Sequence, residues 1–264
     1  MLRRWIGCGA LVVLSACAAG RLSPDACAPV RVMTWNIAAG HGDLGKVVKT
    51  IRELNPDVVA LQEVDVRWSE RSAFVDQADS LRKSLKMNVR FAPIYDFRPR
   101  QFGVAILSRY PIVSWKNHEI TRLSTQQPNA APAKAPGFLE TVLDIPGERV
   151  RVFSTHLDYR SDPSVRMRQV AEMIDIISRS GMPTILAGDL NATPSAVELR
   201  PLMAMFQISA SEMTYPADIP AKQIDYVLTS SAFSINDSRV YSTDASDHRP
   251  VVTTISPCRV RFAK

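Results

Sequence analysis

The chain has 264 residues, of which 46% are hydrophobic and 22% are charged, and its formal net charge is +6. This composition fits one ordinary globular domain with a sizeable core, with two small domains as the alternative, and no low-complexity tract or internal repeat divides the chain. Without Arg3 and Arg4, 30 basic residues face 26 acidic ones, so about +4 remains. That mild excess suits a phosphate-bearing substrate or an anionic surface and does not require nucleic acid.

The N-terminus reads as an export signal. A basic start, an apolar run at 5–14 and small residues are typical of a secretory signal, and the run is too short to span a bilayer. The letters LSAC resemble the lipobox of bacterial lipoproteins, whose Cys is lipidated and becomes the new N-terminus. We expect residues 1–16 to be a signal peptide, Cys17 to carry lipid and 17–29 to form a short tether. Cleavage after Ala18 is the alternative.

Localisation and cysteine usage follow from this expectation. Ala18 is not the Asp that retains a lipoprotein in the inner membrane of enteric bacteria, so in a Gram-negative host we predict an outer-membrane anchor facing the periplasm, with a secreted or periplasmic protein as the alternative. The predicted catalytic domain is 30–264, and Cys27 comes just before its first strand and Cys258 just after its last. If the first and last strands are antiparallel neighbours, a disulfide can join these two cysteines outside the cytosol, whereas two unpaired thiols are the other interpretation.

Hydrophobic periodicity predicts the first half of the fold. The pattern at 30–37 alternates as a strand, and apolar residues at helical spacing over 44–54 predict an amphipathic helix that ends at Asn55 and Pro56. The apolar run at 57–62 indicates a strand buried on both faces. After a polar loop come a helix at 76–87, strands at 89–95, 103–108, 111–119 and 138–145, and, between the last two strands, a Pro/Ala-rich loop at 128–137.

The second half adds strands and two helices. We predict strands at 149–157, 183–190, 224–228, 238–242 and 249–255, a helix through Val170 that stops at Gly181, and a helix capped by Ser195 that runs to about Phe206. Strands outnumber helices and several follow one another without a helix between them, which argues against a doubly wound parallel sheet. The expected fold is an α/β (α+β) four-layered sandwich, in which two packed mixed sheets are flanked by helices.

Polar side chains that core packing does not explain stand at strand ends and turns. They are Asn36, Glu63, His156, Asp189, Asn191, Asp225, Asp247 and His248. Carboxylates, carboxamides and imidazoles that converge from several strand ends would form a site for a hard divalent cation and a phosphate. The other two histidines, His41 and His118, lack such a setting, and we expect His118 to lie at the surface.

Each of these residues also has a structural interpretation. Glu63 follows a buried strand, where it would need either a cation or a buried salt bridge to an Arg. Asp189 and Asn191 are two apart in GDLN, which also suits an Asx turn. His248 follows Asp247, and Asp225 from another strand is the candidate that orients its ring.

The segments WN, QE, SRYPI, THLD, GDLN, IDYVL and SDHRP, in this order, resemble the endonuclease/exonuclease/phosphatase family, which has the fold of pancreatic deoxyribonuclease and the neutral sphingomyelinases. The resemblance covers about 30–255. It implies a four-layered, deoxyribonuclease-I-like sandwich and cleavage of phosphodiesters or phosphomonoesters with Mg²⁺, with Mn²⁺ as the alternative and Ca²⁺ less favoured.

The resemblance also implies a metal site. Glu63 would be the principal metal ligand, with Asn36 beside it and Asp247 near the same ion.

The remaining residues would act on water and phosphate. Asp189 would position or deprotonate the attacking water, Asn191 would hold the scissile phosphate, and His156 and His248 would bond its non-bridging oxygens. Asp225 would orient His248. We assign the role of general base to Asp189 and His248 jointly.

We therefore expect an exported, metal-dependent phosphoesterase, monomeric, whose partner is a phosphate ester. Nucleic acid, a lipid head group and a small phosphoester remain open as substrates. In a nuclease, basic residues and Trp68 would line a groove for nucleic acid. In a lipid enzyme, Trp68 with Phe74, or Tyr95 with Phe97, would form exposed apolar loops. The alternative function is a catalytically silent binding module on the same scaffold.

Overall fold

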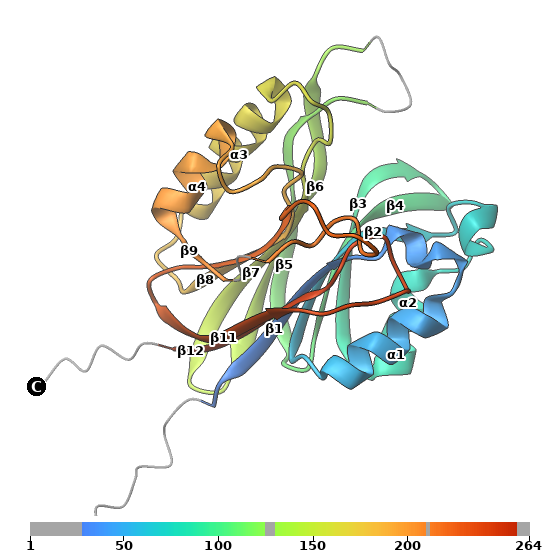
Figure 1. Ribbon diagram of the computed structural model, residues 1–264, viewed down its shortest axis with the longest axis horizontal. Helices are drawn as coiled ribbons and strands as arrows, with labels where there is room; N and C mark the ends of the chain where they lie inside the picture. The colour runs from blue at the N-terminus through green and yellow to red at the C-terminus, as the bar shows by residue number, and fades with distance from the viewer. Residues whose placement is uncertain (1–27, 125–129, 210–211, 258–264) are drawn as a thin grey trace, which may run out of the picture.

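The computed structural model describes residues 28–124, 130–209 and 212–257 (Figure 1). The predicted signal peptide and Cys17, Cys27 and Cys258 lie outside these residues, so lipidation and the disulfide stay predictions. Among the helices of the described ranges, none is both long and apolar enough to cross a membrane.

Two six-stranded mixed sheets form the centre of the molecule, and they confirm the predicted fold class. The first sheet has the order β11-β12-β1-β2-β4-β3 and the second has the order β5-β6-β7-β8-β10-β9. The first comprises β1 (Val30–Asn36), β2 (Val58–Val66), β3 (Asn88–Phe97), β4 (Arg100–Ser108), β11 (Phe233–Val240) and β12 (Val251–Pro257). The second comprises β5 (Ile112–Arg122), β6 (Ala133–Ile145), β7 (Glu148–His156), β8 (Thr184–Asp189), β9 (Gln207–Ile208) and β10 (Asp225–Thr229).

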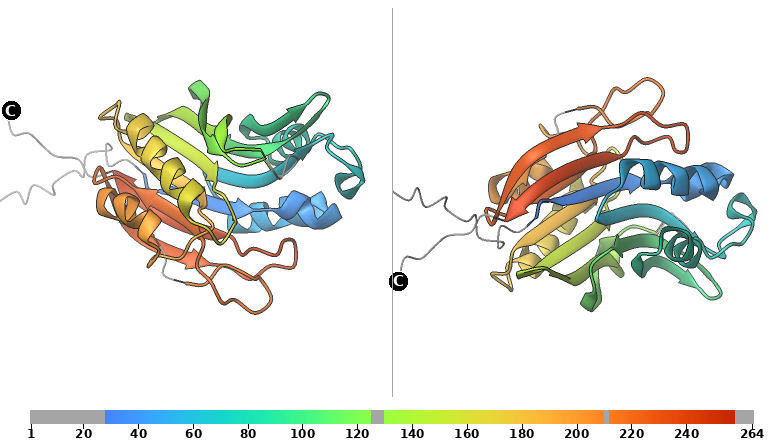
Figure 2. Two further views of the ribbon diagram at one scale, coloured as in Figure 1. Left: turned by 90° about the horizontal axis from the view of Figure 1, so that it is seen from above. Right: turned by 90° about the horizontal axis from the view of Figure 1, so that it is seen from below.

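Helices cover the outer faces of both sheets, so the molecule has four layers. The helices α1 (Leu44–Leu54) and α2 (Gln77–Leu85) lie on the first sheet, and α3 (Ser164–Ile177) and α4 (Arg200–Met205) lie on the second (Figures 1 and 2). Three short 3₁₀ turns, η1 (Ala38–Gly42), η2 (Glu70–Ser72) and η3 (Val197–Leu199), complete the described elements.

Three buried apolar clusters hold these layers together. One lies between the sheets and includes Val32 and Val152, a second packs Trp35 and Leu61 against α1 and α2, and a third lies beneath α3 and α4 around Phe153. Strand β2 contributes to the first two, because its side chains are buried on both faces, as its continuous apolar run predicts.

The predicted helix at 44–54 is confirmed at both ends. Asp43 caps it, since its carboxylate accepts a hydrogen bond from the Lys46 amide at 3.2 Å. It ends at Asn55, which adopts the left-handed conformation with φ 48°. The buried face carries Val47, Val48 and Ile51, which are the positions that the periodicity indicates.

Two predicted elements differ from the structure. The helix expected from Ser195 is divided into η3 and α4, and Ser195 does not cap it, because its Oγ lies 3.3 Å from Thr193 Oγ1 instead. The α-helix begins only at Arg200, with a proline in its first turn. The strand expected at 238–242 begins earlier, since β11 starts at Phe233.

Parallel pairing brings the predicted site residues together. Within each sheet one pair of strands is parallel, β1 with β2 through α1 and β7 with β8 through α3, while the other pairs are antiparallel. Asn36 therefore ends β1 opposite Gln62, and His156 ends β7 opposite Asp189. At the other end of the sandwich β1 and β12 are antiparallel neighbours, which is the arrangement that the expected disulfide requires.

Candidate active site

A β-bulge presents Glu63 to the site. The pairing of β2 with β4 shifts between Leu61 and Val64, so Gln62 and Glu63 together face one residue of β4. Glu63 takes the left-handed conformation, with φ 56°, and is half-buried while its neighbour Gln62 is fully buried. The bulge thereby turns a carboxylate out of a strand whose other side chains belong to the core.

Asn36 links the acids of the two sheets. Its Nδ2 donates to Glu63 Oε1 at 3.1 Å and to Asp189 Oδ2 at 3.1 Å, while its Oδ1 accepts a bond from the Ala38 amide at 3.0 Å. The Asn36 side chain is buried, so one amide group holds two carboxylates from different sheets next to each other. The convergence of Glu63 and Asp189 predicted from the sequence is thus observed.

The turn after β8 positions Asp189 and Asn191. Gly188 is required before them because a Cβ at this position would lie 2.2 Å from the Thr155 carbonyl of β7. Asp189 Oδ1 accepts from the Asn191 amide at 2.8 Å, so the Asx turn does form, but Oδ2 still faces the site. Asn191, with φ 49°, donates from Nδ2 to the Leu157 carbonyl at 3.0 Å.

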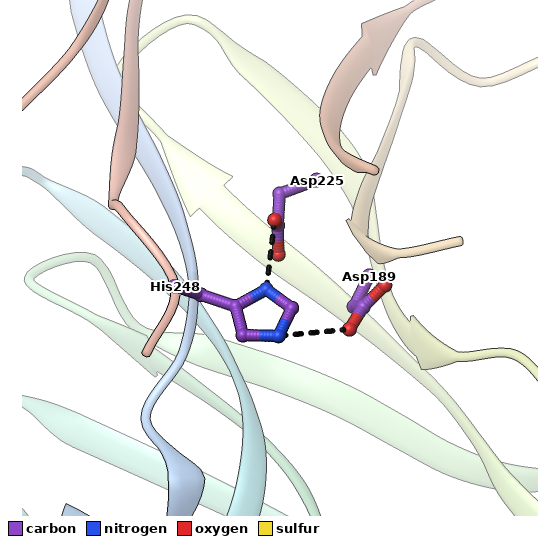
Figure 3. A group of neighbouring side chains, drawn as sticks. All are labelled: Asp189, Asp225 and His248. Atoms are coloured by element: carbon purple, nitrogen blue, oxygen red, sulfur yellow. Dashed lines mark hydrogen bonds and ion pairs between the residues drawn. The ribbon is translucent and has the colours of Figure 1, made fainter. Parts of the chain in front are cut away.

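Two imidazoles approach the same carboxylate oxygen, and Figure 3 shows that of His248. His248 Nδ1 lies 3.0 Å from Asp225 Oδ2, and its Nε2 lies 3.8 Å from Asp189 Oδ2. His156 Nε2 lies 3.5 Å from the same Asp189 oxygen. The predicted pairing of His248 with Asp225 is therefore present, and Asp225 starts β10 directly opposite Asp189 on β8.

Burial and neighbouring charges shift the pKa values of Asp189 and His248. Burial and the neighbouring Asp225 charge raise the pKa of Asp189, although both histidines oppose the change. Burial alone would lower the pKa of His248, but attraction to Asp225 and the hydrogen bond to it dominate and raise that pKa to about 9. The pair favours a protonated imidazole held by Asp225.

The loop that carries His248 is fixed by its backbone. Trp35 Nε1 donates to the His248 carbonyl at 2.8 Å, and Ser246 Oγ donates to the Asn36 carbonyl at 2.7 Å. Asp247 is exposed, and its Oδ1 lies 3.4 Å from Ser246 Oγ, so it borders Asn36 through that hydroxyl.

One contact of the site was not predicted. The Tyr215 ring lies 4.7 Å from the His248 imidazole, centroid to centroid, at an interplanar angle of 43°. Tyr215 sits in the long connection between β9 and β10, where neither periodicity nor a motif marks it.

The donors of the site fit a divalent cation better than a salt bridge. Within the described ranges no lysine or arginine forms an ion pair with Glu63, Asp189 or Asp225; Arg71 pairs with Asp65 instead, at 2.7 Å. Asp225 Oδ1 is buried without a hydrogen-bond partner in the same ranges. Three carboxylates with no lysine or arginine partner, against the single imidazolium of His248, leave an excess of oxygen donors, which is the chemistry that Mg²⁺ and Mn²⁺ bind.

Two parts of the site could hold that cation. Ligand atoms of Asp189, Asp225 and His248 lie within 4.8 Å of one another. The His248 nitrogen that faces Asp225 is occupied by that hydrogen bond, and a protonated imidazole cannot ligate a metal. Glu63 is half-buried and offers a carboxylate without such competition. Asn36 turns its Nδ2 toward Glu63 and its Oδ1 toward the Ala38 amide, so its carboxamide oxygen would have to turn to join the same ion.

Comparisons with known proteins agree with this fold. The solved structure of an endonuclease/exonuclease/phosphatase from Beutenbergia cavernae is 23% identical, with a TM-score of 0.69 over 89% of this chain and 73% of that one. The human Nocturnin catalytic domain is 19% identical, with a TM-score of 0.67 over 87% and 95% of the two chains. A mannosyl-6-phosphatase from Bacteroides thetaiotaomicron is 15% identical, with a TM-score of 0.65 over 86% and 99%.

The structural similarities establish the fold, and a sequence profile establishes the family. A search of curated proteins found no match. The profile of the Endonuclease/Exonuclease/phosphatase family matches residues 33–248, a span that runs from β1 to the site histidine on the final loop. The chain belongs to the endonuclease/exonuclease/phosphatase family.

Proposed function

We propose that the protein is an exported, metal-dependent phosphoesterase that hydrolyses a phosphoester bond, in the first place a phosphodiester, by attack of water on phosphorus. The observation that carries the proposal is the meeting of Asn36, His156 and His248 around one oxygen of Asp189. This arrangement supplies an acceptor for the proton of water and donors for phosphate oxygens in one place. The family membership and the hydrolase named among the structural neighbours, a mannosyl-6-phosphatase, support the same reaction class.

The position of each residue indicates its role in the proposed reaction. Asp189 Oδ2 would accept a hydrogen bond from the attacking water and take up its proton; His248, expected from the sequence to share this role, is held protonated by Asp225 and would instead donate from Nε2. Asp225 holds Nδ1 of His248, so Nε2 faces Asp189 and the phosphate. His156 would donate to a non-bridging oxygen from the second sheet. Asn191 would use the N–H of Nδ2 that does not bond Leu157.

Glu63 and Asn36, with Asp247 at the exposed rim, would hold Mg²⁺, or Mn²⁺ in its place. Bound there, the cation would offset the negative charge of the phosphate and of the leaving oxygen. The bulge at Glu63 supports this assignment, because its left-handed backbone, which is costly for a non-glycine residue, turns a carboxylate out of a buried strand toward Asn36.

A substrate and metal screen tests the proposal. The purified chain is incubated with Mg²⁺, Mn²⁺ or Ca²⁺ and with plasmid DNA, sphingomyelin, phosphatidylinositol or bis(p-nitrophenyl) phosphate. We expect hydrolysis of at least one substrate with Mg²⁺ or Mn²⁺, and its loss in EDTA. A folded protein that hydrolyses none of them would favour a binding module.

Matched carboxamide variants locate the metal site. Glu63→Gln should lose activity and should also lose the rise in melting temperature that Mg²⁺ gives the wild type. Glu53→Gln is the control, because Glu53 is an exposed residue of α1 that pairs only across the helix surface with Lys49. Full activity in Glu63→Gln, or the same loss in both variants, would contradict the assignment.

Export rests on the N-terminal sequence. We propose that residues 1–16 direct secretion and that Cys17 anchors the mature protein to the outer membrane by a lipid. Expression of the full chain in a Gram-negative host should place it in the membrane fraction, and Cys17→Ala should remove it from that fraction. A soluble wild-type protein would indicate secretion or a periplasmic location instead.

A further inference from the structure

A pocket opens beside the candidate active site. It has a volume of about 270 Å³, and Glu63 and His156 form part of its lining. One wall comes from the first sheet and from the loop after β2, and the opposite wall comes from the loop after β7. The pocket therefore lies against two side chains that we place at the scissile phosphate.

Aromatic side chains form the first wall. Trp68 and Phe102 lie 5.7 Å apart, centroid to centroid, and Tyr95 lies 6.2 Å from Trp68 and 6.1 Å from Phe102. Trp68 and Phe102 belong to none of the three apolar clusters of the described core, and both are only half-buried. Core packing does not explain why these rings are gathered next to Glu63.

The opposite wall adds a further ring. Tyr159 follows β7, lines the same pocket and is 64% exposed. The Arg160 guanidinium lies 5.1 Å from its ring centroid and forms an ion pair with the buried Asp158. The two walls thus present aromatic faces from different sheets to one narrow space.

A guanidinium without a carboxylate partner lies between these walls. Arg122 lines the pocket and donates to the carbonyls of Pro136 at 2.8 Å, Gly137 at 2.9 Å and His156 at 3.1 Å. In the described ranges it makes no ion pair with Asp or Glu. Its positive charge is therefore available to an anionic group bound next to the rings.

We propose that this pocket binds a planar aromatic ring carried by the phosphoester on one side of the scissile phosphate. The ring would stack against Trp68 and its neighbours, opposite Tyr159, while Arg122 faces the phosphate. Ligand pockets commonly measure about 300–1,000 Å³, so this one suits a single ring system rather than the two chains of a lipid. The inference rests on the proposed function, because it specifies the substrate of the same site.

A nucleobase and an aryl ester share the chemistry that such a wall recognises, since each offers a flat π-face. Three phosphonates that cannot be hydrolysed separate the possibilities: phenylphosphonate, cyclohexylphosphonate and the phosphonate analogue of thymidine 5′-monophosphate. The phenyl and cyclohexyl groups have similar size, and only the phenyl ring is flat. Inhibition of bis(p-nitrophenyl) phosphate hydrolysis and quenching of tryptophan fluorescence both measure their binding.

We expect the wild type to bind phenylphosphonate about tenfold more tightly than cyclohexylphosphonate, and Trp68→Leu to abolish that preference. Trp115→Leu is the matched control, because Trp115 is an exposed residue of β5 that does not line the pocket. Tyr159→Ala, on the exposed wall, should weaken the preference without affecting the fold. Tighter binding of the thymidine analogue would identify a nucleobase, and tighter binding of phenylphosphonate would identify an aryl group.

Equal binding of the phenyl and cyclohexyl compounds by the wild type would overturn the proposal, as would a ring preference that survives in Trp68→Leu. Failure of the proposed function has a different outcome. If no phosphoester is hydrolysed but phenylphosphonate still quenches fluorescence in preference to cyclohexylphosphonate, the ring pocket stands and the catalytic proposal falls. If hydrolysis occurs without any ring preference, the catalytic proposal stands and the ring pocket falls.

Discussion

Two buried histidine–carboxylate groups in this molecule differ in how their negative charge is balanced. In the site, His248 bonds Asp225 at 3.0 Å and also faces Asp189. On the outer face of the second sheet, His118 Nε2 lies 2.6 Å from Glu140 Oε2. The second group, which we call the Glu140 cluster, also contains Arg151, whose Nε donates to Glu140 Oε1 at 2.7 Å.

The difference lies in how the negative charge is balanced. Glu140 has a nitrogen donor on each oxygen, and Arg151 also donates to the carbonyls of Ile176 and Ile177 at the end of α3. The two site aspartates face each other across β8 and β10 instead, and one buried oxygen of Asp225 has no partner in the described ranges. The Glu140 cluster, in which each carboxylate oxygen has a nitrogen donor, stabilises the fold. The site has more carboxylate oxygens than donors, which is typical of a group that binds a cation or a proton.

The pKa directions express the same contrast. Burial alone would raise the pKa of Glu140, but the bonds from His118 and Arg151 outweigh it and lower that pKa to about 2. Burial and the charge of Asp225 raise the pKa of Asp189. The ionised form of Glu140 therefore stabilises the folded protein, and the ionised form of Asp189 destabilises it.

The largest expected effect is on activity in Asp189→Asn. Asn keeps one acceptor oxygen but removes the charge and basicity of the carboxylate that three side chains approach, so kcat should fall by about 10³-fold. Because the charge at this position opposes folding, the melting temperature should be equal to or above that of the wild type. Steady-state kinetics and thermal unfolding of the same preparation test both parts. A variant that loses activity only because it unfolds would contradict the comparison.

The sequence predicted the site better than the Glu140 cluster. Asp225 begins a strand that is otherwise mostly apolar, and His248 stands in the turn before another, so their position beside core residues marks them as unusual. His118 was expected at the surface, and that prediction is wrong, because the residue is only 9% exposed. It lies in a polar strand, and only the register of β5 against β6 and the packing of α3 bring it to Glu140 and Arg151.

Contacts between segments far apart in the chain also explain the features of the site that the sequence did not predict. The strand order and the two parallel pairs place the predicted residues together, and their identities are visible in the sequence. The bulge at Glu63 depends on pairing with β4, and Tyr215 reaches His248 through an irregular connection. Neither has a periodic pattern, since both follow from contacts between segments far apart in the chain.

The second prediction concerns stability. Glu140→Gln should reduce the free energy of unfolding at neutral pH by at most about 3 kcal/mol, and by less where water screens the cluster. Activity should be unchanged, because the side chain touches no residue of the site. Urea unfolding measures the stability, and Glu119→Gln, an exposed residue of the neighbouring strand β5 outside the cluster, is the control. Equal stability of Glu140→Gln and the wild type would show that the cluster contributes nothing.

The stabilisation by Glu140 should also depend on pH. The folded-state pKa of about 2 lies below the ordinary value of 4.5, so the contribution is complete above pH 4.5 and is lost as the pH falls toward 2. Between those values the wild type should lose stability more steeply than Glu140→Gln. Unfolding curves of both proteins from pH 5 to the lowest pH at which they stay folded test this, and parallel curves would contradict it.

The smallest effect is expected for Asp225→Asn. This residue holds the Nδ1 side of the His248 ring, and its replacement leaves the other side chains of the site in place. Loss of such a positioning carboxylate commonly costs about 10–100-fold in activity, less than the loss of Asp189. Asn also removes the repulsion between two acids that face each other across β8 and β10 and, in the opposite direction, the attraction that raises the pKa of His248, so the melting temperature should change little. A loss of activity as large as in Asp189→Asn would mean that Asp225 contacts the reacting groups directly. A marked loss of stability would mean that the charges of the site are balanced as those of the Glu140 cluster are.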